Sequence, residues 1–289
     1  MLRFALALAA LLAVPALAFG QTTQYAPSDP DASPNQAGHE LVVEAKLTDK
    51  GDTIERGLVW RVFADKTDDD GKLPLVATAE GGTHSFTLPA GVYLVHAAFG
   101  RAGATKRVTI ANSGASETMV LDAGGLKLNA VADGHKLQDR FLRFSIYGLA
   151  SDEDADEREL IARNVTANRV VRLSAGTYHV VSTYGSINTS VTADLEVAAG
   201  QVTEATLQQR GAVVQLKFVS RAGGDPIANS AWTILAGNGE KLFESNNLAP
   251  VLVLAEGLYE ASVRNGGEVH VKNFEVKSGQ DVTVEVLLQ

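Results

Sequence analysis

A six-residue signature of the form Leu-x-(Ala/Glu)-Gly-x-Tyr occurs three times in the chain, at residues 88–93, 173–178 and 254–259. The copies follow one another at intervals of roughly 80 residues, a length that suits one small domain each. A repeated unit of this size constrains the architecture before any single residue is interpreted. The sequence therefore predicts three tandem units of the same fold.

Each signature leads into a segment in which side chains alternate with a period of two residues, as in a half-buried strand. An aromatic run precedes each signature, and we expect Trp60, Phe144 and Trp232 in these runs to lie in the core. Many short strands separated by turns, with no helices between them, are typical of β-sandwiches. The predicted fold class is all-β, with three tandem antiparallel β-sandwiches.

One segment favours a helix when it is read alone. Residues 152–163 are rich in Glu, Ala and Arg, and Asp154 and Glu157 have the spacing of a capping box. Residues 73–76 occupy the equivalent place in the first unit and look extended. The repeat therefore predicts a strand over 160–165.

The signature also predicts a tyrosine corner in each unit. Gly91, Gly176 and Gly257 allow a tight turn at the start of a strand. The tyrosine two residues later can bury its ring and return its hydroxyl to a nearby backbone group. This assigns the tyrosines a structural role.

Residues 1–20 have the form of a secretory signal peptide. Arg3 precedes an apolar stretch over 4–14, and an Ala-Leu-Ala cleavage signal comes next. We expect cleavage after Ala18 or Gly20, and a periplasmic or secreted protein. No later stretch approaches about 20 consecutive apolar residues, so no membrane span is expected.

Residues 21–38 have no apolar period and predict a flexible tether. We place the three sandwiches at 39–123, 124–210 and 211–289. No Pro-, Gly- or Ser-rich linker separates them, so the units should form a semi-rigid rod. Because the chain has no cysteine, no disulfide can stabilise units of this size, and each depends on its own core or on its neighbours.

The formal net charge of −9 argues against binding to a nucleic-acid backbone, which requires clustered Lys and Arg. Arg101, Lys106 and Arg107 form the densest basic group, and we interpret it as a solvated hairpin. No nucleic-acid partner is expected.

No residue pattern predicts catalysis. The chain has neither a Gly-x-Ser-x-Gly elbow nor a phosphate-binding loop before a helix. No two histidines have the spacing of a metal-ligand motif. We therefore expect a protein that is not an enzyme, with no cofactor and no catalytic, cofactor-binding or metal site. The six histidines considered are His39, His84, His96, His135, His179 and His270.

Two acidic loops, at 65–71 and 151–157, occupy the same place in the first two units. Each offers several carboxylates, but the ligand alternation and the distal Glu of a calcium loop are missing. We prefer a solvated loop between strands, and weak calcium binding is the alternative.

The Leu-Pro-Ala-Gly-Val-Tyr motif at 88–93, its two relatives and the length of the unit resemble the prealbumin-like family of bacterial β-sandwich modules. That group includes carboxypeptidase-regulatory-like domains, the B-type repeats of collagen adhesins and PEGA-type domains. The resemblance covers most of 39–289. It implies prealbumin-like or Ig-like sandwiches that serve as stalks, spacers or interaction modules, generally without catalysis.

These features together predict an exported, non-enzymatic structural or protein-interaction module of the bacterial envelope, whose partner is an envelope or extracellular protein. The alternative is a carbohydrate- or ligand-binding protein, with a polysaccharide as its partner. Trp60 and Trp232 separate the two hypotheses, because core burial would prevent them from stacking on a sugar.

Overall fold

The computed structural model describes residues 38–149 and 158–288. All the regular structure of these residues consists of strands, as predicted. No helix in this part of the chain is long and apolar enough to cross a membrane. The predicted signal peptide, nearly all of the tether and the second acidic loop, at 151–157, lie outside the described residues.

The first sandwich packs a three-stranded sheet, in the order β4-β1-β7, on a four-stranded sheet, in the order β3-β2-β5-β6. Its strands are β1 (His39–Lys46), β2 (Leu58–Ala64), β3 (Leu75–Gly81), β4 (His84–Leu88), β5 (Gly91–Phe99), β6 (Ala102–Ile110) and β7 (Ala115–Val120).

The second sandwich repeats this plan with the sheets β12-β8-β15 and β11-β10-β13-β14, and the short β9 pairs with the end of β8. Its strands are β8 (Ala123–Ala132), β9 (His135–Lys136), β10 (Leu142–Gly148), β11 (Leu160–Val165), β12 (Val170–Ser174), β13 (Gly176–Tyr184), β14 (Ser190–Val197) and β15 (Val202–Gln209).

The third sandwich has the sheets β19-β16-β22 and β18-β17-β20-β21. Its strands are β16 (Gly211–Val219), β17 (Ala231–Ala236), β18 (Lys241–Ser245), β19 (Val251–Ala255), β20 (Gly257–Asn265), β21 (Glu268–Val276) and β22 (Val282–Leu287).

The all-β sandwich architecture is confirmed, but the sheets are not purely antiparallel. In each sandwich the first strand pairs in parallel with the last, as β1 with β7, β8 with β15 and β16 with β22. Two parallel neighbouring strands cannot be joined by a tight turn. Here all the other strands of the sandwich lie between the first and the last strand in the sequence and connect them. Side-chain alternation has the same period in both directions, so it could not reveal this pairing.

Residues 160–165 form the strand that the repeat predicted, while 152–157 of the segment that favoured a helix lie outside the described residues. This strand is β11, and it pairs antiparallel with β10 so that Val165 lies opposite Phe144. Tertiary pairing therefore overrides the helix propensity of this segment.

Each sandwich has a hydrophobic core, and the predicted aromatic residues occupy equivalent places in them. Trp60, Phe144 and Trp232 are exposed by 0%, 0% and 1%, on β2, β10 and β17. The second core also includes Val213 and Val253 from the third sandwich. The second and third sandwiches therefore share buried apolar surface.

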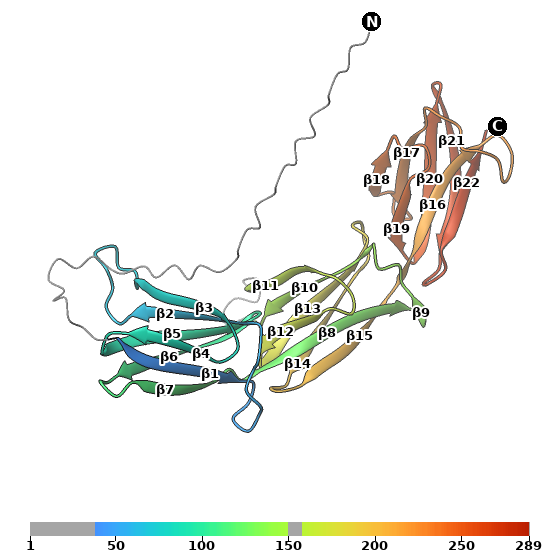
Figure 1. Cartoon of the computed structure of the whole chain (residues 1–289). Helices are drawn as coiled ribbons and strands as arrows, with labels where there is room; N and C mark the ends of the chain where they lie inside the picture. Colours follow the sequence, from blue (N-terminus) through green and yellow to red (C-terminus); the bar gives the residue numbers. More distant parts are fainter. Residues whose placement is uncertain (1–37, 150–157, 289) are drawn as a thin grey trace, which may run out of the picture.

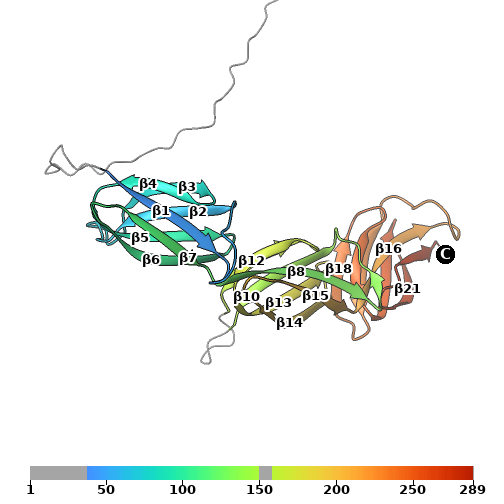
Figure 2. The same cartoon turned by 60° about the horizontal axis from the view of Figure 1, so that its bottom comes forward.

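The three sandwiches follow one another in an elongated array, which Figures 1 and 2 show from two directions. Two residues separate β7 from β8, and Arg210 alone separates β15 from β16. Such short connections restrict the motion of each sandwich relative to the next. The contacts between neighbouring sandwiches are therefore important for any interpretation of function.

Candidate functional site

The signature tyrosines form the predicted corners. Each hydroxyl donates a hydrogen bond to the carbonyl oxygen four residues earlier, at 3.0 Å for Tyr93, 2.9 Å for Tyr178 and 2.9 Å for Tyr259. Burial raises the pKa of all three phenols. The second and third corners use a glycine with positive φ, at 146° and 153°, which L-residues rarely adopt. The signature thus stabilises the fold.

The two tryptophans provide no exposed surface on which a sugar could stack. Trp60 Nε1 donates to the Gly82 carbonyl at 2.8 Å. Trp232 is equally buried, but its Nε1 has no hydrogen-bond partner among the described residues. The two tryptophans therefore share a buried indole ring, but only Trp60 has a hydrogen bond at Nε1 within the described residues.

Two carboxylates of the first acidic loop have partners within the chain. Asp68 Oδ1 accepts bonds from the backbone amides of Asp70 and Lys72, at 3.1 and 2.8 Å. The Asp65 carboxylate pairs with Arg107 at 2.5 Å. Across residues 38–149 and 158–288, no group of three or more His, Cys, Asp or Glu side chains could hold a metal ion. The solvated loop that we preferred stays a prediction, and the second loop lies outside the described residues.

The histidines lie apart in the structure as they do in the sequence. His96 Nδ1 is 2.9 Å from Thr105 Oγ1, and His179 Nδ1 is 2.6 Å from Asp194 Oδ1. Burial is the main cause that lowers the pKa of His96, and the nearby Arg61 adds to it. His270 is buried against Phe218, with 4.9 Å between the ring centroids.

The first joint is the contact between the first and second sandwiches, and the turn between β5 and β6 forms one part of it. Gly100 in this turn lies so close to Arg172 of β12 that a methyl group would be 2.8 Å from Arg172 Cβ. The Arg101 amide donates to the Arg172 carbonyl at 3.0 Å, and the Arg172 guanidinium lies 4.2 Å above the Phe99 ring. The turn thus forms a backbone hydrogen bond with β12 on the side of this strand that faces away from β8. Arg101, which we interpreted as part of a solvated hairpin, belongs to this joint.

The second joint, between the second and third sandwiches, uses the same turn in the same way. Gly185 follows β13, and a methyl group there would lie 2.6 Å from Cβ of Val253 on β19. Asn188 in this turn donates to Tyr259 Oη at 3.0 Å and accepts from the Ala255 amide at 2.9 Å. In both joints the glycine is the seventh residue after the signature tyrosine of its own sandwich. The residue that it contacts in the next sandwich directly precedes the signature leucine there.

Further polar contacts fix the second joint on its other side. The Gln138 side chain donates to Asp281 at 2.7 Å, and the second oxygen of Asp281 accepts from the Val213 amide at 2.9 Å. Ser278 Oγ donates to the Gln209 carbonyl at 3.3 Å. Several independent bonds therefore hold the third sandwich against the second.

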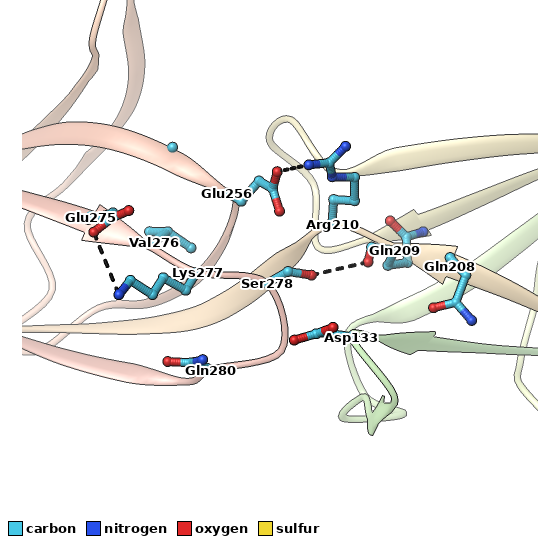
Figure 3. Close-up of a pocket in the computed structure, with 11 residues that line it drawn as sticks. Asp133, Gln208, Gln209, Arg210, Glu256, Glu275, Val276, Lys277, Ser278 and Gln280 are labelled. Atoms are coloured by element: carbon cyan, nitrogen blue, oxygen red, sulfur yellow. Dashed lines mark hydrogen bonds and ion pairs between the residues drawn. The ribbon is translucent and has the colours of Figure 1, made fainter.

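A polar cleft of about 720 Å³ opens at this second joint (Figure 3). Arg210 forms an ion pair with Glu256 across the cleft, and Lys277 lies 3.9 Å from Glu275. Gln209 is buried at one side, where its Nε2 donates to the Ser182 carbonyl and hydroxyl oxygens at 2.9 Å each. Its Oε1 has no partner in the described part of the chain. Acidic and basic groups thus largely neutralise one another here.

A smaller cleft of about 370 Å³ at the first joint has a different charge. Four arginines line it, and none of the described residues that line it is acidic. In a chain with net charge −9, this concentrates positive potential at one place. The four residues are Arg101, Arg163, Arg169 and Arg172.

The sequence predicted short junctions but not the residues that form the joints. The signal in the sequence is a glycine at a fixed distance from the signature tyrosine, at Gly100 and Gly185. The same glycine occurs at 266, where no described residue other than its chain neighbours lies within 4 Å of its Cβ position. The signal therefore marks the turn, and only the structure shows which surface the turn contacts.

The comparisons with known proteins match one part of the chain to a family. Residues 213–288 match the Rhizobiales growth-associated tandem repeat domain, and this range lies within the third sandwich. None of the curated proteins compared with the chain matches it significantly.

Several solved structures are distantly similar. The TIE protein of Bacillus anthracis is 18% identical with a TM-score of 0.25, over 88% of this chain and 50% of that one, so the chain spans half of its length. The minor pilin GBS52 of Streptococcus agalactiae is 13% identical with a TM-score of 0.29, over 59% and 95%. The shaft pilin spaA of Lactobacillus rhamnosus GG is 10% identical with a TM-score of 0.30, over 58% and 98%. Similarity at this level carries no information on function.

Proposed function

We propose that this chain is an exported, non-enzymatic structural or protein-interaction rod of the bacterial envelope. In this proposal a cleaved leader at 1–20 and a tether at 21–38 precede three folding units at 39–123, 124–210 and 211–289. The rod holds its units in a fixed relation, so that binding surfaces on different units keep a constant separation.

The observation that carries the proposal is that one device forms both joints. Gly100 contacts Arg172, and Gly185 contacts Val253, at equivalent positions of the repeat. The connections of one or two residues leave little freedom for rotation. The match of 213–288 to a tandem repeat domain agrees with an array of this kind.

Small-angle scattering on the mature chain, extrapolated to low concentration, tests the rod. A compact chain of this length would have a radius of gyration of about 18 Å, and we expect a clearly larger value with the profile of a stiff rod. A broad, concentration-independent distribution of lengths would show flexible joints and contradict the proposal. Fractionation of the host cell tests export, which requires the mature chain outside the cytoplasm.

The arginine-lined cleft at the first joint supports a second candidate function, binding of an acidic ligand such as a uronate-containing polysaccharide. Guanidinium groups pair well with carboxylates, and the residues of 38–149 and 158–288 that line the cleft include no acidic side chain. Because Trp60 and Trp232 are buried, recognition would rest on charge and not on stacking on these rings.

Calorimetric titration with oligogalacturonate tests this second function. Saturable binding that weakens with salt and is lost in Arg163→Ala/Arg169→Ala would support it. Arg264→Ala, an exposed arginine of the third sandwich, is the matched control. Equal binding of a neutral oligosaccharide, or equal loss in the control, would contradict it.

A further inference from the structure

The third sandwich differs from the other two at the edge of its four-stranded sheet. Val269 and Val271 on the edge strand β21 point outward and are exposed by 54% and 51%. Outward β-branched apolar residues on an edge strand are a known site of strand pairing between chains. The edge strands of natural β-sheets usually avoid such exposed apolar residues.

The equivalent edges of the first two sandwiches are polar. The strands align because each signature tyrosine lies opposite a core residue of the edge strand, Val108, Leu195 or Phe274. In that alignment Val271 corresponds to Thr105 and Thr192. The apolar edge is therefore specific to the third sandwich. The positions equivalent to Val269 are Gly103 and Ser190.

The backbone of this edge is also available. The β20–β21 hairpin closes with Asn265 opposite Glu268 across a two-residue turn, so hydrogen-bonded pairs with β20 fall on alternate residues from Glu268 onward. The amide and carbonyl groups of Val269 and Val271 consequently point away from β20. They lie on the open side of the sheet, where no further strand of the described chain follows.

The start of β21 reads Glu-Val-His-Val-Lys from 268 to 272, and this segment is complementary to itself in an antiparallel arrangement. We propose that a second copy of the chain docks here, strand β21 against strand β21, with His270 opposite its own copy on a two-fold axis. Glu268 then lies opposite Lys272 twice, and Val269 opposite Val271 twice. Opposite charges and β-branched pairs directly across a ladder both stabilise it.

The hydrogen-bonding pattern agrees with this register. The Val269–Val271 pairs join residues whose free amides and carbonyls face the partner, so each pair exchanges two backbone hydrogen bonds. A register centred on Val271 would place His270 opposite Lys272 and Val269 opposite Asn273. A register centred on Lys272 would oppose two lysines. Charge and burial therefore both select the pairing at His270.

The position of β21 makes this dimer sterically feasible. The pairing segment begins at the turn farthest from the second joint, and the first two sandwiches lie at the other end of the rod (Figure 1). Antiparallel pairing then directs the two rods away from the axis in opposite directions. Leu287 and Leu288, exposed by 45% and 46%, add apolar surface at the same end, because β22 runs parallel to β16 toward Val219. The isologous contact closes at two copies.

Sedimentation equilibrium of the mature full chain, over a wide range of concentration, tests the proposal. We expect a reversible dimer, weak because the paired segment is short, and about twice as long as the monomer in scattering. Glu268→Lys should raise the dissociation constant about tenfold or more, since symmetry creates two like-charge pairs. The double variant Glu268→Lys/Lys272→Glu should restore dimerisation.

Val271→Lys provides a second test that does not depend on the charge pairs, and it should abolish the dimer. Thr192→Lys makes the same change at the equivalent place on β14 and should leave the dimer intact. Circular dichroism and thermal melting check that each variant folds. A chain that is monomeric at every concentration would overturn the proposal, as would a dimer unaffected by Glu268→Lys and Val271→Lys. Neither result bears on the rod proposed above, whose test concerns the monomer.

Discussion

At the first joint Gly100 lies against Arg172, and at the second Gly185 lies against Val253, so the backbone contact is the same while the chemistry differs. The first joint adds an arginine over an aromatic ring and a cleft whose charged residues, among those the structure describes, are all arginines. The second adds buried apolar residues from the third sandwich, the bridging Asn188 and a cleft lined by both acidic and basic residues. The repeat sets how neighbouring sandwiches meet, and the side chains set how firmly they are held.

The largest effect expected from this comparison concerns the turn glycine. Gly185→Ala should lower the free energy of unfolding by about 2–4 kcal/mol, because it adds a steric conflict with Val253 to the strain of a residue at φ 79°. Gly266→Ala is the matched control, since Gly266 has φ 57° and, apart from its chain neighbours, no atom of the described residues lies near its Cβ position. It should cost only about 1 kcal/mol.

Gly100→Ala should fall between these two, because its new methyl group would lie 2.8 Å from Arg172 Cβ, a less severe conflict than the 2.6 Å from Val253 Cβ at Gly185. Urea denaturation of the three variants measures the series. Equal losses in all three would show that backbone strain alone matters and that the joints contribute nothing.

A smaller difference is expected between two tyrosine corners. Tyr178→Phe removes one hydrogen bond and should cost about 0.5–1.5 kcal/mol. Tyr259→Phe should cost about 1–2.5 kcal/mol, because the Asn188 amide also loses its acceptor across the second joint. A double-mutant cycle with Asn188→Ala isolates that bond, and zero coupling between the two positions would contradict its role in the joint.

Arg172→Ala tests the weaker chemistry of the first joint. The exposed guanidinium over Phe99 should contribute about 0.5–1 kcal/mol, since a solvated cation–π contact is modest. Thermal unfolding of the variant measures it, and Arg172→Lys should recover only part of the loss. If Arg172→Ala lowered the free energy of unfolding by more than Gly185→Ala does, the first joint would contribute more stability than the second, contrary to the prediction.

The smallest effect is expected far from both joints and provides their baseline. Asp69→Asn/Asp70→Asn in the first acidic loop should change stability by less than about 0.5 kcal/mol, and reduced repulsion could make the change favourable. Asp68 is left unchanged because its carboxylate accepts two backbone bonds. Calorimetry with calcium is the companion measurement, and micromolar binding that this variant abolishes would contradict a purely solvated loop.

Much of the fold inside each sandwich could be predicted because local periodicity reports burial. The alternation after each signature identified strands, and comparison of the repeats predicted the strand β11 over 160–165 where the local composition favoured a helix. The signature predicted the tyrosine corners, and the equivalent positions of the aromatic residues predicted the burial of Trp60 and Trp232. The parallel pairing of first and last strands could not be, because a strand has the same side-chain period in either direction.

The sequence alone was enough to predict a β unit repeated three times, with buried aromatic residues and short connections. The three turns share a glycine and differ in whether another sandwich of the described chain packs against them. Tertiary packing therefore makes Gly100 and Gly185 joints and leaves Gly266 without such a neighbour among the described residues. It likewise decides that Val269 and Val271 lie on an open edge. The joints and the open edge both depend on contacts between residues far apart in the sequence, and local side-chain periodicity does not report such contacts.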